Sequence, residues 1–220
     1  GVIDFFNGVI DAHALRRIIL NQQEVYPAPF YYALMNLLGS HDKARIINRL
    51  SDATPENRPR GERRHELLSP AQYALGRARY IKAWEFICSL PGMPCVYYAD
   101  EAGMEGCADP FCRRTYPWGE EDKQLLAYYR GMIAMRNHNA VLRTGECKFI
   151  APCDGVLGVI RTITGGKDAL GRKAKDACSV TLINRSSRAV DIYLTAKELT
   201  GAAQIVSDRE ASLPSRTEIK

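Results

Sequence analysis

The sequence has 220 residues, 46% of them hydrophobic and 25% charged, which fits an ordinary globular protein of one large domain or two modest ones. No apolar stretch approaches the roughly 20 residues of a membrane span, so we expect no membrane partner. The net charge of +5 is mild. The basic stretches 58–64 and 167–175 lack the aromatic or base-reading partners of a nucleic-acid surface, so we expect no nucleic acid partner either.

The termini and cysteines say little about location. The chain begins with Gly1 rather than Met and has no basic region or cleavage site of a signal peptide, so we expect an excised piece of a longer protein. Seven dispersed cysteines without a CxxC pair indicate no metal site. Their odd number favours a reducing, cytoplasmic compartment, while a secreted parent with free thiols stays open.

The first elements in chain order are a helix and a strand. Apolar residues recur at helical spacing over residues 4–26, and Pro27 and Pro29 end that pattern. The apolar run 30–38 is typical of a strand that is buried on both faces in a parallel sheet.

The chain then alternates between helix and strand. We expect a polar surface loop over residues 51–66 and a helix over 70–90 that Ser69 caps. A short buried strand over 93–98, a loop with several glycines over 100–119 and a third helix over 121–137 should follow. This is the alternation of βα units with a parallel sheet. Two strands cannot close a barrel or cover their own edges, so the rest of the sheet must come from elsewhere.

The pattern of apolar and polar residues changes after about residue 145. Short alternating runs separated by turn residues suggest a small antiparallel sandwich with strands over residues 147–150, 156–160, 179–183 and 190–194. The charged, Gly-containing stretch 166–176 has almost nothing to bury and is expected to be a mobile hairpin loop.

Polar motifs follow both predicted strands of the first region, where a (β/α)₈ barrel keeps its chemistry. The first reads Asn-Leu-Leu-Gly-Ser-His-Asp over residues 36–42. Taken alone, His41 and Asp42 could equally cap the loop. The second reads Pro-Gly-Met-Pro-Cys-Val-Tyr-Tyr-Ala-Asp-Glu from residue 91, and then Asp-Pro-Phe-Cys-Arg-Arg from residue 109 and Pro-Trp at 117–118.

Over roughly residues 4–140 these motifs, in this order, strongly resemble the α-amylase family. Its last barrel strand reads Pro-Gly-x-Pro-x-Ile-Tyr-Tyr-Gly-Asp-Glu and leads to Asp-Pro-x-x-Arg and Pro-Trp. The motif sequences are especially similar to those of neopullulanases, cyclomaltodextrinases and maltogenic amylases. The resemblance implies an α/β plus all-β chain. Residues 1–140 would be the C-terminal part of a (β/α)₈ TIM barrel, with its last two strands, and residues 141–220 an antiparallel β-sandwich, domain C.

The resemblance also implies roles for four residues. Asp42 matches the acidic residue that binds ring hydroxyls at the cleavage point and stabilises the transition state, and His41 matches the histidine beside it. Asp109 and Arg113 match a substrate-binding pair, for which fixing the loop and touching the sugar stay equally open. Trp118 matches a residue that serves mainly in loop packing, although it could be a sugar platform. Trp84, Tyr80 and Phe86 are expected in the core.

Three departures from the family pattern matter. Lys43 replaces the usual Thr after His-Asp, and Ala99 replaces the usual Gly before Asp-Glu. The family's nucleophile Asp and acid Glu lie on the fourth and fifth barrel strands, before anything present here. A retaining glycosidase needs two carboxyl groups about 5 Å apart across the bond, so we expect the isolated chain to be inactive.

The sequence therefore predicts part of a retaining hydrolase of α-1,4 glucosidic bonds in an α-glucan, and cleavage of α-1,6 bonds as well stays open. The alternatives are an α-glucosidase or glucanotransferase parent, or a non-catalytic carbohydrate-binding or assembly module. No cofactor is expected, although calcium in the missing part of the parent stays open. The open sheet edges predict self-association of the isolated chain.

Overall fold

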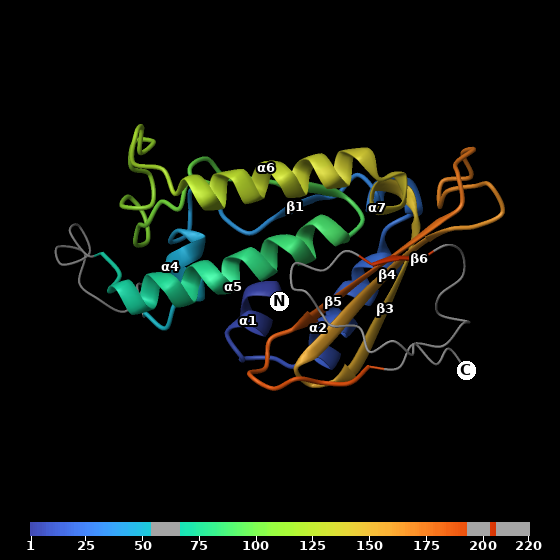
Figure 1. Ribbon diagram of the computed structural model, residues 1–220, viewed down its shortest axis with the longest axis horizontal. Coiled ribbons are helices and arrows are strands. Elements are labelled where there is room, and N and C mark those ends of the chain that lie inside the picture. The colour runs from blue at the N-terminus through green and yellow to red at the C-terminus, as the bar shows by residue number, and fades with distance from the viewer. Residues whose placement is uncertain (54–66, 193–202, 206–220) are drawn as a thin grey trace. The chain divides into compact units, whose positions relative to one another are not determined.

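The computed structural model describes residues 1–53, 67–192 and 203–205 (Figure 1). They form two compact units that interleave along the chain. The first contains residues 1–10, 35–88 and 93–135, and the second combines 11–34 and 89–92 with the chain from 136 onward. The division at residue 140 expected from the sequence stays a prediction.

The first unit contains short and long helices and a small sheet. Its elements are α1 (Val2–Phe6), β1 (Met35–Leu37), α4 (Ile46–Leu50), α5 (Pro70–Ser89), β2 (Met93–Cys95) and α6 (Lys123–His138). The last residue of α5 and the last three residues of α6 are assigned to the second unit. β1 and β2 pair in parallel, with Met35 opposite Met93. This confirms the parallel pairing expected from the alternation of helix and strand.

The core of this unit is aromatic. The Trp84 ring stacks on Tyr129 with centroids 4.4 Å apart, and the Tyr80 ring lies 5.4 Å from Tyr129. Trp84, Tyr80 and Phe86 are all buried, which confirms the core prediction for these three residues.

The first two sequence expectations were wrong in extent. The helix expected over residues 4–26 is interrupted at Gly8, whose φ of 80° is left-handed, and α2 (Ala12–Val25) begins afresh where Asp11 Oδ1 accepts from Ala14 N at 2.6 Å. Within the apolar run 30–38 only β1 is a strand, because Pro27 starts the short helix α3 (Ala28–Tyr31).

In the described structure β1 and β2 are not buried on both faces, as strands inside a complete parallel sheet would be. Met35 is 60% exposed, Met93 56% and Leu37 45%, so apolar side chains of this two-stranded sheet face solvent in the described structure. The strands are apolar as a barrel strand would be, but the described residues supply no cover for this side.

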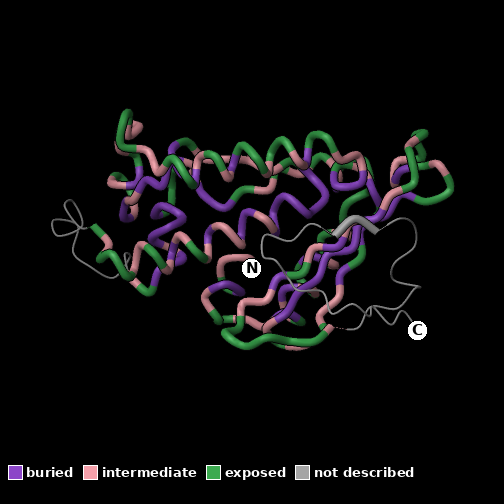
Figure 2. Tube along the Cα trace, in the orientation of Figure 1, coloured by how far each residue is buried: buried purple, intermediate pink, exposed green. Residues whose placement is uncertain are grey.

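The second unit contains α2, α3 and α7 (Ala140–Thr144) with one four-stranded sheet. Its strands are β3 (Glu146–Cys153), β4 (Val156–Ile163), β5 (Ala177–Asn184) and β6 (Ala203–Ile205) in that order. β4 is buried along its whole length (Figure 2), and α2 packs against β3 and β4. A central strand of the sheet that is covered in this way anchors the unit.

The predicted strands 147–150, 156–160 and 179–183 are confirmed as parts of β3, β4 and β5, which pair antiparallel. The expectation of antiparallel pairing throughout was wrong, because β6 pairs with β5 in parallel. Residues 190–192 of the fourth predicted strand are not in a strand, and 193–194 lie outside the described residues.

The stretch 166–176 between β4 and β5 is more organised than expected. Asp168 is buried and accepts hydrogen bonds from Leu170 N at 3.0 Å, Arg172 N at 2.9 Å and Arg172 Nε at 3.0 Å. The expectation that this stretch has almost nothing to bury was therefore wrong at Asp168, which folds the loop around its carboxylate.

Two buried arginines fasten α7 within the second unit. Arg161 on β4 donates to the carbonyls of Ser89 at 2.8 Å, Leu142 at 2.7 Å and Gly145 at 2.9 Å. Arg136 donates to Leu142 O at 2.8 Å. Carbonyls near the end of a helix lack intrahelical donors, and here guanidinium groups supply them.

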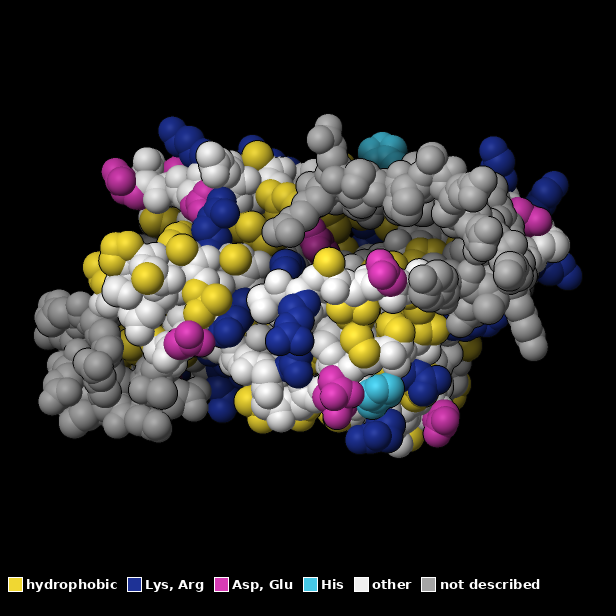
Figure 3. Space-filling model, turned by 60° about the horizontal axis from the view of Figure 1, so that its bottom comes forward, with side chains coloured by type: hydrophobic (Ala, Val, Ile, Leu, Met, Phe, Trp, Pro, Cys, Tyr) yellow, Lys and Arg dark blue, Asp and Glu magenta, His cyan; other side chains and the backbone are white. Residues whose placement is uncertain are grey.

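The helices of the described residues include none with the length and apolar character needed to cross a membrane. On the face drawn in Figure 3, Lys and Arg side chains stand among Asp, Glu and apolar side chains.

Candidate functional site

The loop after β1 carries the first predicted pair. His41 Nε2 lies 3.1 Å from Asp42 Oδ1, and the two side chains are 64% and 68% exposed. The turn is supported by Ser40, whose Oγ accepts from Asp42 N at 3.4 Å. An exposed carboxylate beside an exposed imidazole can accept from and donate to hydroxyl groups of a ligand.

The loop after β2 carries the second predicted pair. Arg113 Nη2 forms an ion pair with Asp109 Oδ1, four residues earlier, and both side chains are about half exposed. Arg113 Nε also donates to the backbone carbonyl of His41 at 3.3 Å, and Cys112 Sγ lies 3.2 Å from the same oxygen.

The structure therefore brings the four predicted residues together, from segments about 70 residues apart in the sequence. The side chains of Asp42 and His41 contact each other. The Arg113 side chain contacts the backbone carbonyl of His41 and forms an ion pair with the Asp109 carboxylate. The contact with His41 O gives Arg113 a structural task in joining the two loops. A contact of any of the four with a sugar stays a prediction.

Sequence reasoning missed the arginine that underlies these loops. Arg45 is 1% exposed, donates through Nε to Cys112 O at 2.7 Å and through Nη1 to Asp100 Oδ1 at 3.1 Å, and also donates to Tyr98 O. Its guanidinium carbon lies 4.4 Å from the centroids of both the Tyr97 and the Tyr98 ring. Arg45 thus connects the loop after β1 to the loop after β2 through hydrogen bonds, charge and cation–π contact.

One signal for Arg45 was present in the sequence. It stands between Ala44 and Ile46, at the start of the apolar turn that becomes α4, and both neighbours are fully buried. An arginine inside a buried apolar segment needs a partner, and the acidic residue of the second motif supplies it.

Asp100 is held tightly against the first loop. A Cβ added to Gly39 would lie 2.2 Å from Asp100 Oδ2, so only glycine leaves room for this carboxylate. Burial raises the pKa of Asp100 to about 7, although the charge and hydrogen bond of Arg45 act to lower it.

This pKa predicts an unusual dependence of stability on pH. The pKa of Asp100 is about 7 in the folded chain against an ordinary value of 3.8. Between these values the folded state binds more protons than the unfolded state, so the unfolding free energy falls as pH rises. The stabilisation is complete below about pH 4 and lost as pH passes about 7. Urea unfolding at pH 5 and pH 8 should therefore show wild type losing up to a few kcal/mol relative to Asp100→Asn, at about 1.4 kcal/mol per pKa unit.

The matched control is Asp52→Asn, which changes a 70% exposed carboxylate that pairs with Arg79. It should leave the pH dependence of wild type in place. A wild type that gains stability relative to Asp100→Asn between pH 5 and pH 8 would mean that attraction to Arg45 outweighs burial, and the predicted sign would be wrong.

The departure at Ala99 has a structural consequence. Ala99 has a φ of 65° and is fully buried, so an L-residue occupies the left-handed region where the family pattern has Gly. The backbone keeps a turn suited to glycine, and an alanine there carries roughly 1–2 kcal/mol of strain. Hydrogen bonds from Ala102 N at 3.2 Å and Met104 N at 3.0 Å to Ala99 O hold this turn.

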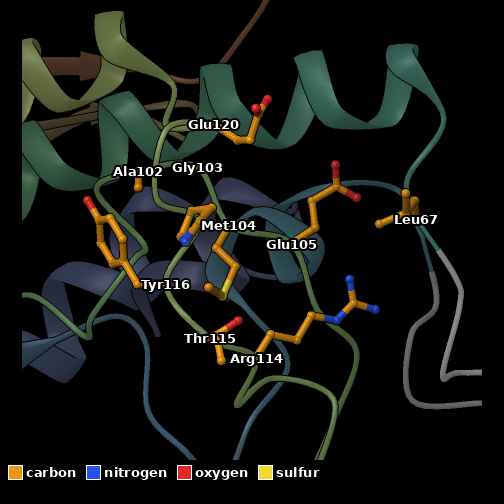
Figure 4. A pocket seen from close by; sticks show the side chains of 10 residues that line it. Leu67, Ala102, Gly103, Met104, Glu105, Arg114, Thr115, Tyr116 and Glu120 are labelled. Carbon is orange, nitrogen blue, oxygen red and sulfur yellow. The ribbon is translucent and has the colours of Figure 1, made fainter.

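A pocket of about 390 Å³ lies in the same unit, but none of the four predicted residues lines it (Figure 4). Its walls are Leu67, Ala102, Gly103, Met104, Glu105, Arg114, Thr115, Tyr116, Pro117 and Glu120. The volume falls within the range of small-molecule sites. No group of three His, Cys, Asp or Glu side chains in the described part of the chain is arranged to hold a metal ion.

Comparison with known proteins adds a family. No protein-family model matches the chain. It is 36% identical over 177 residues to an amylopullulanase of Thermoanaerobacterium thermosulfurigenes, which covers 80% of the chain and 9% of the relative. It is 34% identical over 152 residues to a cyclomaltodextrinase of Bacillus sp, which covers 68% of the chain and 23% of the relative.

Solved structures agree with these relatives. A cyclic α-maltosyl-(1→6)-maltose hydrolase from Arthrobacter globiformis, in complex with that sugar, superposes with a TM-score of 0.61 at 29% identity over 76% of this chain and 33% of the other. A cyclomaltodextrinase superposes with a TM-score of 0.58 at 30% identity over 74% and 25%. The chain spans between about a tenth and a third of the lengths of these proteins. Shared sequence, shared fold and the motifs after β1 and β2 together place the chain in the α-amylase family, where it matches one part of the longer members.

Proposed function

We propose that the chain is the C-terminal segment of a retaining α-glucan hydrolase that cleaves α-1,4 glucosidic bonds. β1 and β2 would be the last two strands of its (β/α)₈ barrel, and the sheet β3–β6 would belong to a β-sandwich, domain C. The observation that carries the proposal is the contact of Arg113 with His41 O, since it brings the motifs after two parallel strands to one place.

The proposed ligand is an α-glucan oligosaccharide. One solved relative, the cyclic α-maltosyl-(1→6)-maltose hydrolase from Arthrobacter globiformis, was solved in complex with that sugar and in complex with maltose. In this chain the exposed Asp42 carboxylate would accept from vicinal hydroxyls and His41 would donate to the same sugar. These contacts tighten as the ring flattens toward an oxocarbenium-like transition state, which is how they would raise the rate.

The loop residues would position this pair. Asp109 and Arg113 fix one another, and Arg113 also holds His41 O, so the second motif supports the geometry of the first. Asp42 is one carboxylate, whereas a retaining mechanism needs a nucleophile and an acid in addition. In the proposed enzyme both come from barrel strands that precede this segment.

The 220-residue chain is therefore expected to show no hydrolysis of starch, cyclodextrins, pullulan or chromogenic maltosides. Without an acid and a nucleophile, a single sugar-binding carboxylate leaves the main sources of rate enhancement absent. The measurement is a reducing-sugar and chromophore-release assay on highly purified chain, beside an Asp42→Ser variant. Turnover above that variant would show that the chain holds a complete catalytic site and that the proposal is wrong.

The isolated chain is also expected to self-associate through the β1–β2 sheet. Met35 and Met93, which face each other across the strands, are 60% and 56% exposed. Apolar side chains on an open two-stranded sheet favour association with another chain. Sedimentation at micromolar concentration should show dimers or larger species.

A pair of variants locates this association. The double variant Met35→Lys with Met93→Lys should shift the chain toward monomer, whereas Val9→Lys, at a 73% exposed position outside the sheet, should not. A wild-type chain that sediments as a monomer would contradict the predicted self-association. A double variant that associates as wild type does would mean that the β1–β2 sheet is not the surface through which the chains associate.

A further inference from the structure

One exposed aromatic residue departs from its expected role. Trp118 was expected mainly to pack within its loop, yet it is 81% exposed. Its ring lies 4.5 Å from the Tyr116 ring, with an angle of 46° between the planes. A large apolar surface left in water is unfavourable by itself, and such surfaces commonly mark a binding site.

The loop that presents these rings is fixed at both ends. Before it, Tyr98 Oη donates to Arg114 O at 2.7 Å. After it, Asp122 N donates to Ala102 O at 2.9 Å, and the Asp122 carboxylate accepts from Arg77 Nε at 2.5 Å. Within it, Trp118 N donates to Tyr116 O at 2.9 Å. Rings on a backbone that is already ordered lose little conformational freedom when a ligand binds.

The pocket described above adjoins this aromatic pair, because Tyr116 and Pro117 form part of its wall. Figure 4 shows Tyr116 on one side and the Glu105 and Arg114 side chains on the other, with Met104 and Thr115 between them. The wall thus combines aromatic and apolar surface with carboxylate, guanidinium and hydroxyl groups.

This combination matches the chemistry of a sugar. A pyranose ring has a face of C–H groups, which packs on an aromatic ring, and a rim of hydroxyls, which both donate and accept hydrogen bonds. Glu105 and Arg114 provide an acceptor and a donor beside the Tyr116 ring, although one Glu105 oxygen already accepts from Leu68 N at 2.7 Å.

We propose that Trp118, Tyr116 and the adjoining pocket form a binding subsite for glucose units of an α-glucan chain. The identity of the sugar rests on the proposed function, whereas the location rests on the exposed rings and the pocket. The residues of this subsite do not include His41, Asp42, Asp109 or Arg113, so it would hold a further stretch of the polysaccharide.

The two tryptophans of the chain make the proposal directly measurable. Trp84 is 1% exposed and Trp118 is 81% exposed, so quenching of fluorescence by iodide reports on Trp118. Titration of the whole chain, at submicromolar concentration, with maltoheptaose should give a saturable decrease in the iodide quenching constant of at least twofold. Cellopentaose, with β-linked glucose, should protect much less.

Variants separate this subsite from the rest of the chain. Trp118→Ala should weaken the binding of maltoheptaose measured by calorimetry more than Arg114→Gln does, and Arg114→Gln should weaken it about tenfold. Phe30→Ala, which removes a 67% exposed aromatic ring elsewhere, should bind as wild type does. Circular dichroism establishes that each variant is folded, and Arg114→Gln provides a second test if Trp118→Ala is not.

Two outcomes would overturn the proposal. The first is the absence of saturable protection at millimolar maltoheptaose, which would also be the result if the rings serve to bind a protein. The second is binding that Trp118→Ala and Arg114→Gln leave unchanged. Asp42→Asn distinguishes this proposal from the catalytic one, since it should leave maltoheptaose protection of Trp118 intact whatever its effect in the complete enzyme.

Discussion

In the complete enzyme, Asp42→Asn is expected to lower kcat by on the order of 10²- to 10³-fold, as for other groups that act mainly on the transition state. Asn keeps the size of the side chain and one acceptor oxygen but removes the charge that would stabilise the flattened, cationic ring. Asp42 is 68% exposed, so the substitution should not disturb folding. Steady-state kinetics on maltooligosaccharides should show kcat falling more than KM rises.

Two comparisons make this result specific. His41→Ala should act in the same direction but more mildly, about tenfold or less, because it removes one neutral hydrogen bond of about 1 kcal/mol. Asp52→Asn removes a similarly exposed carboxylate, which pairs with Arg79, and should leave kcat unchanged. Near-normal kcat for Asp42→Asn would remove Asp42 from the mechanism.

The long helices could be predicted from the sequence because their signals are local. α5 begins at Pro70, where Ser69 Oγ accepts from Gln72 N at 3.3 Å and Gln72 Oε1 accepts from Ser69 N at 3.0 Å. This reciprocal cap was visible in the residue order. The interruption at Gly8 was not recognised, because an isolated glycine inside a helical pattern is often tolerated and only the backbone reveals its φ of 80°.

The strands were harder to predict, since pairing depends on distant segments. β3, β4 and β5 are consecutive in the chain and pair as neighbours, so their alternation was sufficient to find them. β6 pairs with β5 in parallel, which requires a longer connection that no short-range turn signal predicts. β1 and β2 were predicted to be buried strands because most of their residues are apolar, whereas their exposure depends on which segments cover them.

The candidate site divides in the same way. The motifs and their resemblance to a family identified His41, Asp42, Asp109 and Arg113, which the structure brings together. The ion pair between Arg45 and Asp100, 55 residues apart, was not identified, because no feature of either segment indicates which residue it pairs with. Buried polar groups must be paired, but the partner is set by the tertiary fold.

The largest expected effect on stability is at Arg161, which is fully buried on β4. It donates to three backbone carbonyls: Nη1 to Ser89 O and Leu142 O, and Nε and Nη2 to Gly145 O. Arg161→Ala should lower the free energy of unfolding by at least about 3 kcal/mol, since hydrogen bonds from a charged group each contribute about 1.5–3 kcal/mol and a cavity is added. Urea unfolding of the chain measures this, with Lys148→Ala on neighbouring β3 as an exposed control that should stay within about 0.5 kcal/mol.

The loss at Arg161 should be smaller than the sum of its bonds, because two acceptors keep a second donor. Arg136 Nη1 also donates to Leu142 O at 2.8 Å, and Tyr32 Oη donates to Gly145 O at 2.7 Å. The double variant Arg161→Ala with Arg136→Ala would remove both guanidinium donors from Leu142 O. It should therefore lose at least about 0.5 kcal/mol more than the two single variants added together, the mark of coupled sites. Strict additivity would mean that the two arginines act independently, and Arg161→Ala within 1 kcal/mol of wild type would mean that relief from burying the charge offsets its hydrogen bonds.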